Sequence, residues 1–404
     1  PPLAVAWARR VDEAREGARA HDAAKVRAAL LAMRALSPNN PGVALSLAAE
    51  AAHAKDAGEA LRWLETYAAF GTTTHDEDFA SVLADPRAVP VRAKLDANAR
   101  PVEKATRVFA LPTGDRLFED VAWDPAARTF YVSSVRGRDV LAVGQAGADA
   151  RSLTAPERAG LGVSGLAFDA ARRTLWTTVA PIAQVPGFRA GDDTRVACAV
   201  VAVDPASGKP KRRVELAPDG EPHALTDVAV TPAGDVVASD ARGGGVYVLR
   251  AGSTHLERLP ARFRSPQTPA PRDATRAYVP DYSLGVALVD LSNGAAVWLD
   301  APPSVPLTGI DGLYFVGDAL VAVQNGIEPP RISRLALSPD GAHVTGATIL
   351  EAGTPGLGEP THGAIVGGEL WFLAPSGWAR FDDVGALVND PPPDATAIWR
   401  VPIR

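Results

Sequence analysis

The second part of the sequence repeats one unit six times. Each copy is an apolar triplet, a turn and a second apolar strand, as in VAWDPAARTFYV. The copies begin at Val121, Leu166, Val228, Pro269, Leu313 and Ala364. They are spaced about 40 to 60 residues apart, a period and hairpin content typical of propeller blades. We therefore predict an all-β six-bladed β-propeller over residues 101–404, whose ring is closed by pairing TRVFALP with AIWRVPI near the C-terminus.

The first hundred residues follow a different, Ala-rich helical pattern. His21-Asp22-Ala23 matches Lys55-Asp56-Ala57, and small or apolar residues match at the same offset of about 34 residues. This period resembles the tetratricopeptide repeat, with about two copies and a further helix around 78–96. We predict an α-helical domain over residues 1–100. It is either a groove for a peptide or protein partner or a packing appendage, and the second alternative is favoured.

Composition narrows the class of protein. The net charge is −6 with both signs mixed along the chain, so we expect no nucleic-acid partner. No apolar run approaches the roughly 20 residues that span a bilayer, so we expect no membrane partner. The one cysteine, Cys198, lies in a strand-like run and is expected to be an inert buried thiol. The Pro-Pro start, with Met33 as the only methionine, indicates processing on export (periplasmic or secreted) or trimming of a cytoplasmic chain.

The residues before the six inner strands form a predicted ring at one mouth of the tunnel. Two positions before each apolar start stand Glu119, Ser164, Thr226, Gln267, Asp311 and His362. A water-filled polar tunnel would explain the neutral members. Carboxylates with neutral oxygen donors also suit Ca²⁺, which takes six to eight oxygen ligands. Asp120 and Asp227 follow at the next position, where they could hold a second ion or a water cluster.

At these residues the propeller resembles the senescence-marker-protein/gluconolactonase/luciferin-regenerating family. It is also similar to paraoxonase and diisopropyl-fluorophosphatase. The resemblance implies a calcium-dependent hydrolase of lactones or phosphotriesters. Glu119, Asp227 and Asp311 match acidic residues of the family motif, and Glu119-Asp120 resembles the paraoxonase Glu-Asp pair.

Two positions depart from the family pattern. Thr226 and Gln267 stand where the family has Asn, although both still offer a neutral oxygen. Through the resemblance, the expected metal ligands are therefore Glu119, Asp311, Thr226 and Gln267, with Asp120 and Asp227 beneath them. Ca²⁺ is the expected cofactor.

Further side chains are candidates for catalysis or substrate contact. His362 is the one His at the ring register, and it is interpreted as a general base, a ligand contact or a structural hydrogen bonder; Asp311 is the second catalytic candidate. The candidates for substrate contact are His223, Ser164, Asn325 and Trp378. For His223 loop packing is the favoured alternative, and Asn325-Gly326 also fits a turn.

Two functions remain open at this point. The first is a calcium-dependent hydrolase of a small lactone or ester at the mouth of the tunnel. The second is a non-catalytic propeller that binds a ligand or a protein and carries a helical-repeat arm, because one fold hosts many functions. The sequence names neither the substrate nor the oligomeric state.

Overall fold

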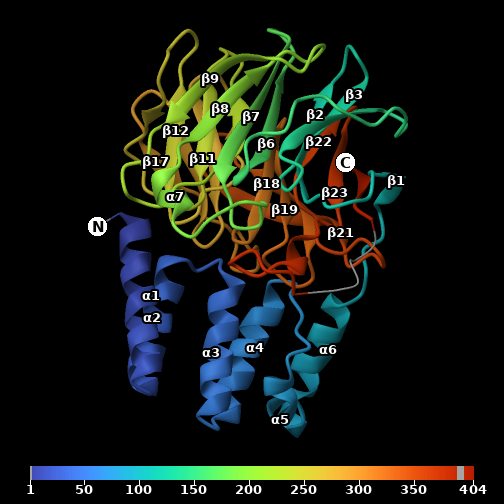
Figure 1. The fold of residues 1–404 in the computed structure, drawn as a ribbon. Coiled ribbons are helices and arrows are strands. Elements are labelled where there is room, and N and C mark those ends of the chain that lie inside the picture. The colour runs from blue at the N-terminus through green and yellow to red at the C-terminus, as the bar shows by residue number, and fades with distance from the viewer. Residues whose placement is uncertain (1, 389–394) are drawn as a thin grey trace.

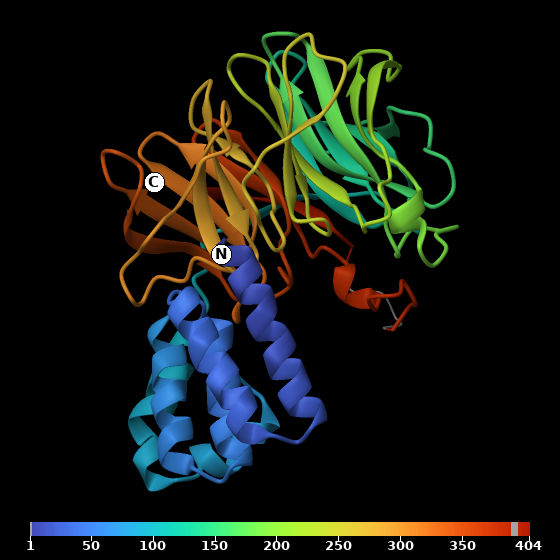
Figure 2. The same cartoon turned by 90° about the vertical axis from the view of Figure 1, so that its left-hand side faces the viewer.

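A computed structural model describes residues 2–388 and 395–404. The helices of residues 2–98, which we call the helical segment, lie on one face of a β-propeller (Figures 1 and 2). Among the residues described, no helix is both long and apolar enough to cross a bilayer. The predicted fold, a six-bladed propeller preceded by helices, is confirmed.

The helical segment contains two hairpins followed by shorter pieces. Its helices are α1 (Leu3–Arg19), α2 (Ala23–Leu36), α3 (Pro41–His53), α4 (Ala57–Ala69), η1 (Glu77–Phe79), α5 (Ala80–Leu83), η2 (Pro86–Ala88) and α6 (Val89–Asn98), where η marks a 3₁₀ helix. The single helix expected around 78–96 is thus broken. Asp85 caps a new start at Pro86, because proline is tolerated only in the first turn of a helix.

The 34-residue offset of the sequence is also an offset of the structure. His21 and Lys55, at matching positions, both have left-handed backbone, with φ of 52° and 60°. The next residues, Asp22 and Asp56, cap α2 and α4 by accepting a hydrogen bond from the backbone N–H three residues later. Each repeat therefore turns in the same way. Membership of the tetratricopeptide class remains a prediction.

Each blade is a four-stranded antiparallel sheet. The strands of each blade follow here in order from the innermost outward. Blade one contains β2 (Phe118–Asp124), β3 (Thr129–Ser134), β4 (Asp139–Gly144) and β5 (Arg151–Ser152); blade two contains β6 (Leu161–Asp169), β7 (Thr174–Pro181), β8 (Cys198–Val203) and β9 (Pro210–Leu216); and blade three contains β10 (Leu225–Val230), β11 (Val236–Asp240), β12 (Gly245–Leu249) and β13 (Glu257–Arg258). Blade four contains β14 (Ala270–Pro271), β15 (Arg276–Asp281), β16 (Gly285–Asp290) and β17 (Ala296–Trp298); blade five contains β18 (Ile310–Val316), β19 (Ala319–Gln324), β20 (Arg331–Leu337) and β21 (Val344–Ala352); and blade six contains β22 (Gly363–Val366), β23 (Glu369–Ala374), β24 (Ala397–Pro402) and β1 (Thr106–Ala110). Two short helices, α7 (Asp192–Arg195) and η3 (Trp378–Arg380), lie in loops.

The ring closes as predicted, because β1 from the start of the propeller pairs with the C-terminal β24. Apolar side chains then fill the space between neighbouring blades. At the closure, Phe130 of blade one stacks on Trp371 of blade six, with ring centroids 5.1 Å apart. Because neighbouring blades cover both faces of each sheet, strands such as β8, β12 and β19 are continuous buried runs, and the free thiol of Cys198 is buried in β8.

The helical segment packs on the mouth face, where the connections into the inner strands lie. Ser37 Oγ donates to Leu284 O in the β15–β16 turn, and Asn40 Nδ2 donates to Ser283 O beside it. Trp7 and Leu284 share one apolar cluster between α1 and blade four. The helices therefore cover the mouth face at blades four and five. The red segment around Trp378 lies on the same side of the propeller, away from the helices (Figure 2).

Candidate active site

β-Bulges set the direction of the ring residues. The pairing register shifts at the ring position in β2, β6, β10 and β18. A bulge leaves backbone groups without ladder partners, and hydroxyls on the second strands satisfy them. Ser133 Oγ accepts from Asp120 N at 2.9 Å, and Thr178 Oγ1 accepts from Gly165 N at 2.8 Å. The adjacent side chains Glu119 and Asp120 are both buried because the bulge breaks the strand's normal alternation.

His362 lies at the centre of the acidic side chains. Its Nε2 is 2.8 Å from Asp227 Oδ1 and 3.7 Å from Asp311 Oδ1. Its Nδ1 is 3.1 Å from the carbonyl oxygen of Glu119 and 3.9 Å from Glu119 Oε1. The neighbours of both ring nitrogens are acceptors, so this arrangement is satisfied when both nitrogens carry protons. His362 is then an imidazolium among three carboxyl groups.

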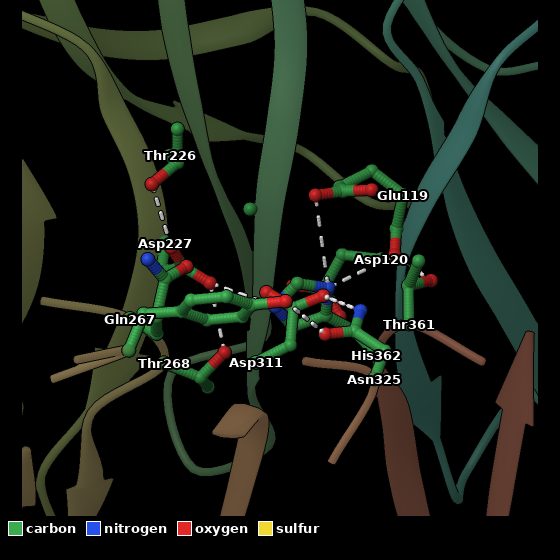
Figure 3. Close-up of polar contacts among 12 residues, drawn as sticks. Glu119, Asp120, Thr226, Asp227, Gln267, Thr268, Asp311, Asn325, Thr361 and His362 are labelled. Carbon is green, nitrogen blue, oxygen red and sulfur yellow. Dashed lines mark hydrogen bonds and ion pairs between the residues drawn. The ribbon is translucent and has the colours of Figure 1, made fainter. Parts of the chain in front are cut away.

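Each carboxyl group has a different set of partners (Figure 3). Asp227 is fully engaged, because Thr226 Oγ1 donates to Oδ2 at 2.6 Å and Thr268 Oγ1 to Oδ1 at 2.8 Å. Glu119 and Asp311 each have one engaged oxygen. Within the described residues Glu119 Oε1 and Asp311 Oδ1 accept no hydrogen bond. These two oxygens belong to the more exposed side chains of the cluster, 11% and 13% against 2% for His362.

Burial and mutual charge shift the pKa values of Glu119, Asp311 and His362. Burial raises the pKa of Glu119 well above its usual value; the His362 charge opposes this rise and the Asp311 charge adds to it. Burial likewise raises the pKa of Asp311, against the opposing charge of His362. For His362, burial lowers the pKa, but Asp311 and the hydrogen bond to Asp227 outweigh it, so that its pKa lies well above the usual value. Such shifts are common at functional sites.

Asp120 lies beneath this centre and faces a second environment. Its oxygens accept from Val121 N and Leu166 N, both at 2.7 Å. Burial raises its pKa to about 7, against the His362 charge and the hydrogen bond from Leu166 N. Asp120 and Tyr314 line a tunnel cavity of about 240 Å³ whose other walls are mostly apolar. The predicted second layer is thus present at Asp120, whereas Asp227 belongs to the upper centre.

Two of the neutral ring candidates donate hydrogen bonds to residues close in sequence, and the third is buried. The Thr226 hydroxyl is bonded to Asp227, and Gln267 Nε2 donates to Ser265 O and Oγ at 3.2 and 3.0 Å. Ser164 is buried in β6. His223 is held between Asp240 and Asp219, with ring-nitrogen distances of 2.5 and 3.0 Å. Its geometry agrees with the loop-packing alternative, and its substrate role remains a prediction.

Two predicted substrate contacts instead touch the carboxyl groups. Asn325 Nδ2 donates to Asp311 Oδ2 at 2.7 Å and to Pro360 O at 3.1 Å. Trp378, in η3, donates its indole N–H to Glu119 Oε2. Both side chains therefore orient the expected metal ligands, which the sequence alone did not indicate.

Sequence reasoning missed two hydroxyls at the centre. Thr268 bonds Asp227, and Thr361 Oγ1 donates to Glu119 O at 2.8 Å. Each is the immediate neighbour of a predicted ring residue, Gln267 or His362. Extending the ring register by one position on both sides would have found them.

The centre has the donors for one divalent cation. One ligand atom each from Glu119, Asp311 and His362 lies within 4.8 Å of the others. An ion at the usual ligand distance of about 2.0–2.6 Å from each fits this spacing. The two free carboxylate oxygens are the natural first ligands, and His362 can add a nitrogen once it has lost a proton. Thr226 donates its hydroxyl hydrogen to Asp227 and Gln267 donates through Nε2, so both side-chain oxygens keep lone pairs for a cation.

Known proteins match this chain in structure but not in sequence. No family model matches it, and no curated protein matches it. Solved structures that match include a gluconolactonase from Xanthomonas campestris (18% identity, 76% of this chain and 92% of that chain, TM-score 0.49) and virginiamycin B lyase from Staphylococcus aureus (13%, 74% and 99%, 0.49). A nidogen/laminin complex also matches (13%, 59% and 87%, 0.43). At these identities the likeness concerns the fold. A gluconolactonase is thus among the structural neighbours of the chain.

Proposed function

We propose that the chain is a cation-dependent hydrolase of a lactone or ester, with its site at the mouth of the tunnel. The observation that carries the proposal is the pair of free carboxylate oxygens, Glu119 Oε1 and Asp311 Oδ1, turned toward His362 from different blades. A partly buried carboxylate oxygen without a donor is costly, and a cation would satisfy both. Ca²⁺ is the ion proposed first, because oxygen donors are in the majority.

When bound, the cation would polarise the substrate carbonyl oxygen. The chain's own groups supply orientation and charge balance. Asn325 and Trp378 occupy the second oxygens of Asp311 and Glu119 and leave the first oxygens free. Asp227, engaged by Thr226 and Thr268, keeps a proton on His362 Nε2. His362 acts as a base only after one ring nitrogen has released its proton.

Metal analysis of the purified, undialysed protein tests the cation and distinguishes Ca²⁺ from Zn²⁺ or Mn²⁺. A panel of five- and six-membered lactones and aryl esters, followed with a pH indicator with and without chelator, tests the reaction. We expect chelator-sensitive release of acid. Asp318→Asn, which changes an exposed carboxylate in the β18–β19 turn opposite the mouth, is the control and should keep activity. A metal-loaded protein that is inactive across the panel would favour the binding propeller instead.

His362→Gln separates two roles at this site. If His362 is the general base, kcat should fall by roughly 10² to 10⁴ with KM little changed. If it only contacts the ligand, KM should rise with kcat nearly constant.

A further inference from the structure

The helical segment contacts the connection that leads into the Asp311 strand. Asn39 Nδ2 donates to Pro302 O at 2.9 Å and to Val305 O at 2.8 Å, and Leu307 N donates to Asn39 O at 3.2 Å. Asn39 itself is 8% exposed. The β17–β18 connection is therefore held by the loop between α2 and α3. Asp311 follows directly in β18.

The same helices also hold the loop that leaves the next strand, β19. Arg331 is 2% exposed and donates from Nη1 to Phe70 O at 3.2 Å and from Nη2 to Gly71 O at 2.8 Å. Thr73 N donates to Glu328 O at 2.9 Å. The chain just after α4 is thus attached to the β19–β20 loop at two points.

The guanidinium of Arg331 packs closely against the backbone of Gly71. Gly71 has φ of +69°, and a Cβ there would lie 3.1 Å from Arg331 Nη1, so glycine gives the guanidinium its room. Within the described residues Arg331 has no carboxylate within ion-pair distance, and its partners are carbonyl oxygens. A buried charge is tolerated only when its donors are satisfied. The helical segment supplies two of these acceptors.

The far end of this loop reaches the candidate active site. Asn325, at its start, donates to Asp311 Oδ2 and accepts from Tyr282 OH at 3.0 Å. The short stretch from Asn325 to Arg331 contains two prolines, Pro329 and Pro330, which restrict its backbone. Engaging Oδ2 leaves Asp311 Oδ1 turned toward His362.

We propose that the helical segment is a positioning element of the candidate active site rather than an appendage. Through Asn39 and Arg331 it fixes the two connections that flank the β18–β19 hairpin, and thereby the direction of the Asp311 carboxylate. Arg331 is a positioning residue, since it acts through Asn325. The effect on cation affinity rests on the proposed function, whereas the effect on the backbone of β18 does not.

The test compares Arg331→Gln with Arg331→Lys and with Arg173→Gln as matched control. Arg173 pairs with buried Asp124 in the hairpin turns opposite the mouth, so its loss destabilises the propeller without touching the site. Two quantities are measured in the full chain, the deuterium uptake of residues 305–316 and the dissociation constant for Ca²⁺. Arg331→Gln should raise the uptake and weaken Ca²⁺ binding about tenfold, as loss of outer-shell support does at metal sites. Arg331→Lys should give an uptake and a Ca²⁺ dissociation constant between those of the wild type and Arg331→Gln. Arg173→Gln should change neither quantity.

Normal uptake and normal affinity in Arg331→Gln would overturn the positioning role. If the wild-type chain binds no Ca²⁺ or other divalent cation, the proposed function fails, and the deuterium uptake alone decides this inference. If Arg331→Gln does not fold, Asn39→Ala replaces it and should raise the uptake of residues 305–316 in the same way. Unchanged uptake in that variant would also overturn the proposal.

Discussion

The two free oxygens of the candidate active site are supported in different ways. On the Asp311 side, Asn325 makes three hydrogen bonds, and the helical segment holds both flanking connections. On the Glu119 side, the carboxylate is held by the indole of Trp378, which lies in a loop between β23 and β24. One side rests on a packed domain and the other on a loop.

In the described part of that loop, Trp378 and Phe381 are only partly buried against a small apolar cluster, and Val384, Leu387 and Val388 are exposed. Gln184 Nε2 donates to Asp382 O at 2.8 Å, and the guanidinium of Arg136 lies 4.7 Å from the Phe381 ring centroid. Segments with few buried contacts open at low free-energy cost. We therefore expect ligands to reach the cation from the Glu119 side, while the Asp311 side stays fixed.

The largest expected effect comes from removing either free carboxylate. Asp311→Asn and Glu119→Gln should each weaken Ca²⁺ binding by about 100-fold or more, because each removes a charged ligand. The measurement is the rise in melting temperature of chelator-stripped protein as Ca²⁺ is added, since a ligand of the native state stabilises by mass action. Equal losses would show that both sides share one ion. A loss in only one variant would break the comparison, because the cation would then rest on one side alone.

The pH dependence of the metal-free protein should be the next largest effect. The carboxyl of Asp120 has its pKa raised by burial to about 7, and Glu119 and Asp311 shift in the same direction. A raised carboxyl pKa makes the folded state bind more protons, so the stability that these three groups contribute is full below about pH 4 and is lost as pH rises to about 7. The loss from Asp120 alone is at most about 4 kcal/mol.

Urea unfolding in chelator at pH 5 and pH 7.5 measures this loss. Added Ca²⁺ should restore more stability at pH 7.5 than at pH 5, because the cation competes with protons for the same oxygens. Equal stability at the two pH values would mean that the carboxyl groups keep another counter-ion.

The sequence predicted the fold because the fold has a period. Apolar triplets and turns recur at blade length, and the turn after β2 repeats in the turn after β6, with left-handed backbone at Arg128 and Arg173. The ring register also selected Glu119, Asp311 and His362, whose ligand atoms the structure brings within 4.8 Å of one another. These features follow from the recurring apolar triplets and turns, and from the fixed offset of two positions between each ring residue and its apolar start.

The interactions between loops could not be predicted in this way. Nothing in the sequence places Trp378 against Glu119 or Arg331 against Phe70 O, since each pair joins residues about 260 positions apart through tertiary packing. The engagement of Thr226 and Gln267 with near neighbours was equally hidden. A polar residue's type gives its hydrogen-bonding capacity but not the partner that uses it.

Asn325→Ala should show the rigidity of the Asp311 side. The change removes the donor to Asp311 Oδ2 and leaves the Tyr282 hydroxyl without its acceptor. We expect Ca²⁺ binding to weaken about tenfold, with a loss of stability of about 1–3 kcal/mol. Titration calorimetry and urea unfolding measure the two effects. Unchanged affinity would mean that Asp311 keeps its direction without Asn325.

Trp378→Phe should give the smallest effect and tests the Glu119 side. The change keeps an aromatic ring against the Leu117, Val135 and Val185 cluster but removes the N–H that bonds Glu119 Oε2. Because the loop is held weakly, Glu119 should retain most of its cation affinity, and we expect a loss of about threefold or less. If substrate enters here, KM should change more than kcat, since a residue at the entrance affects binding before chemistry. A loss as large as that of Asn325→Ala would mean that both sides are equally rigid, and entry would have to be sought elsewhere on the mouth face.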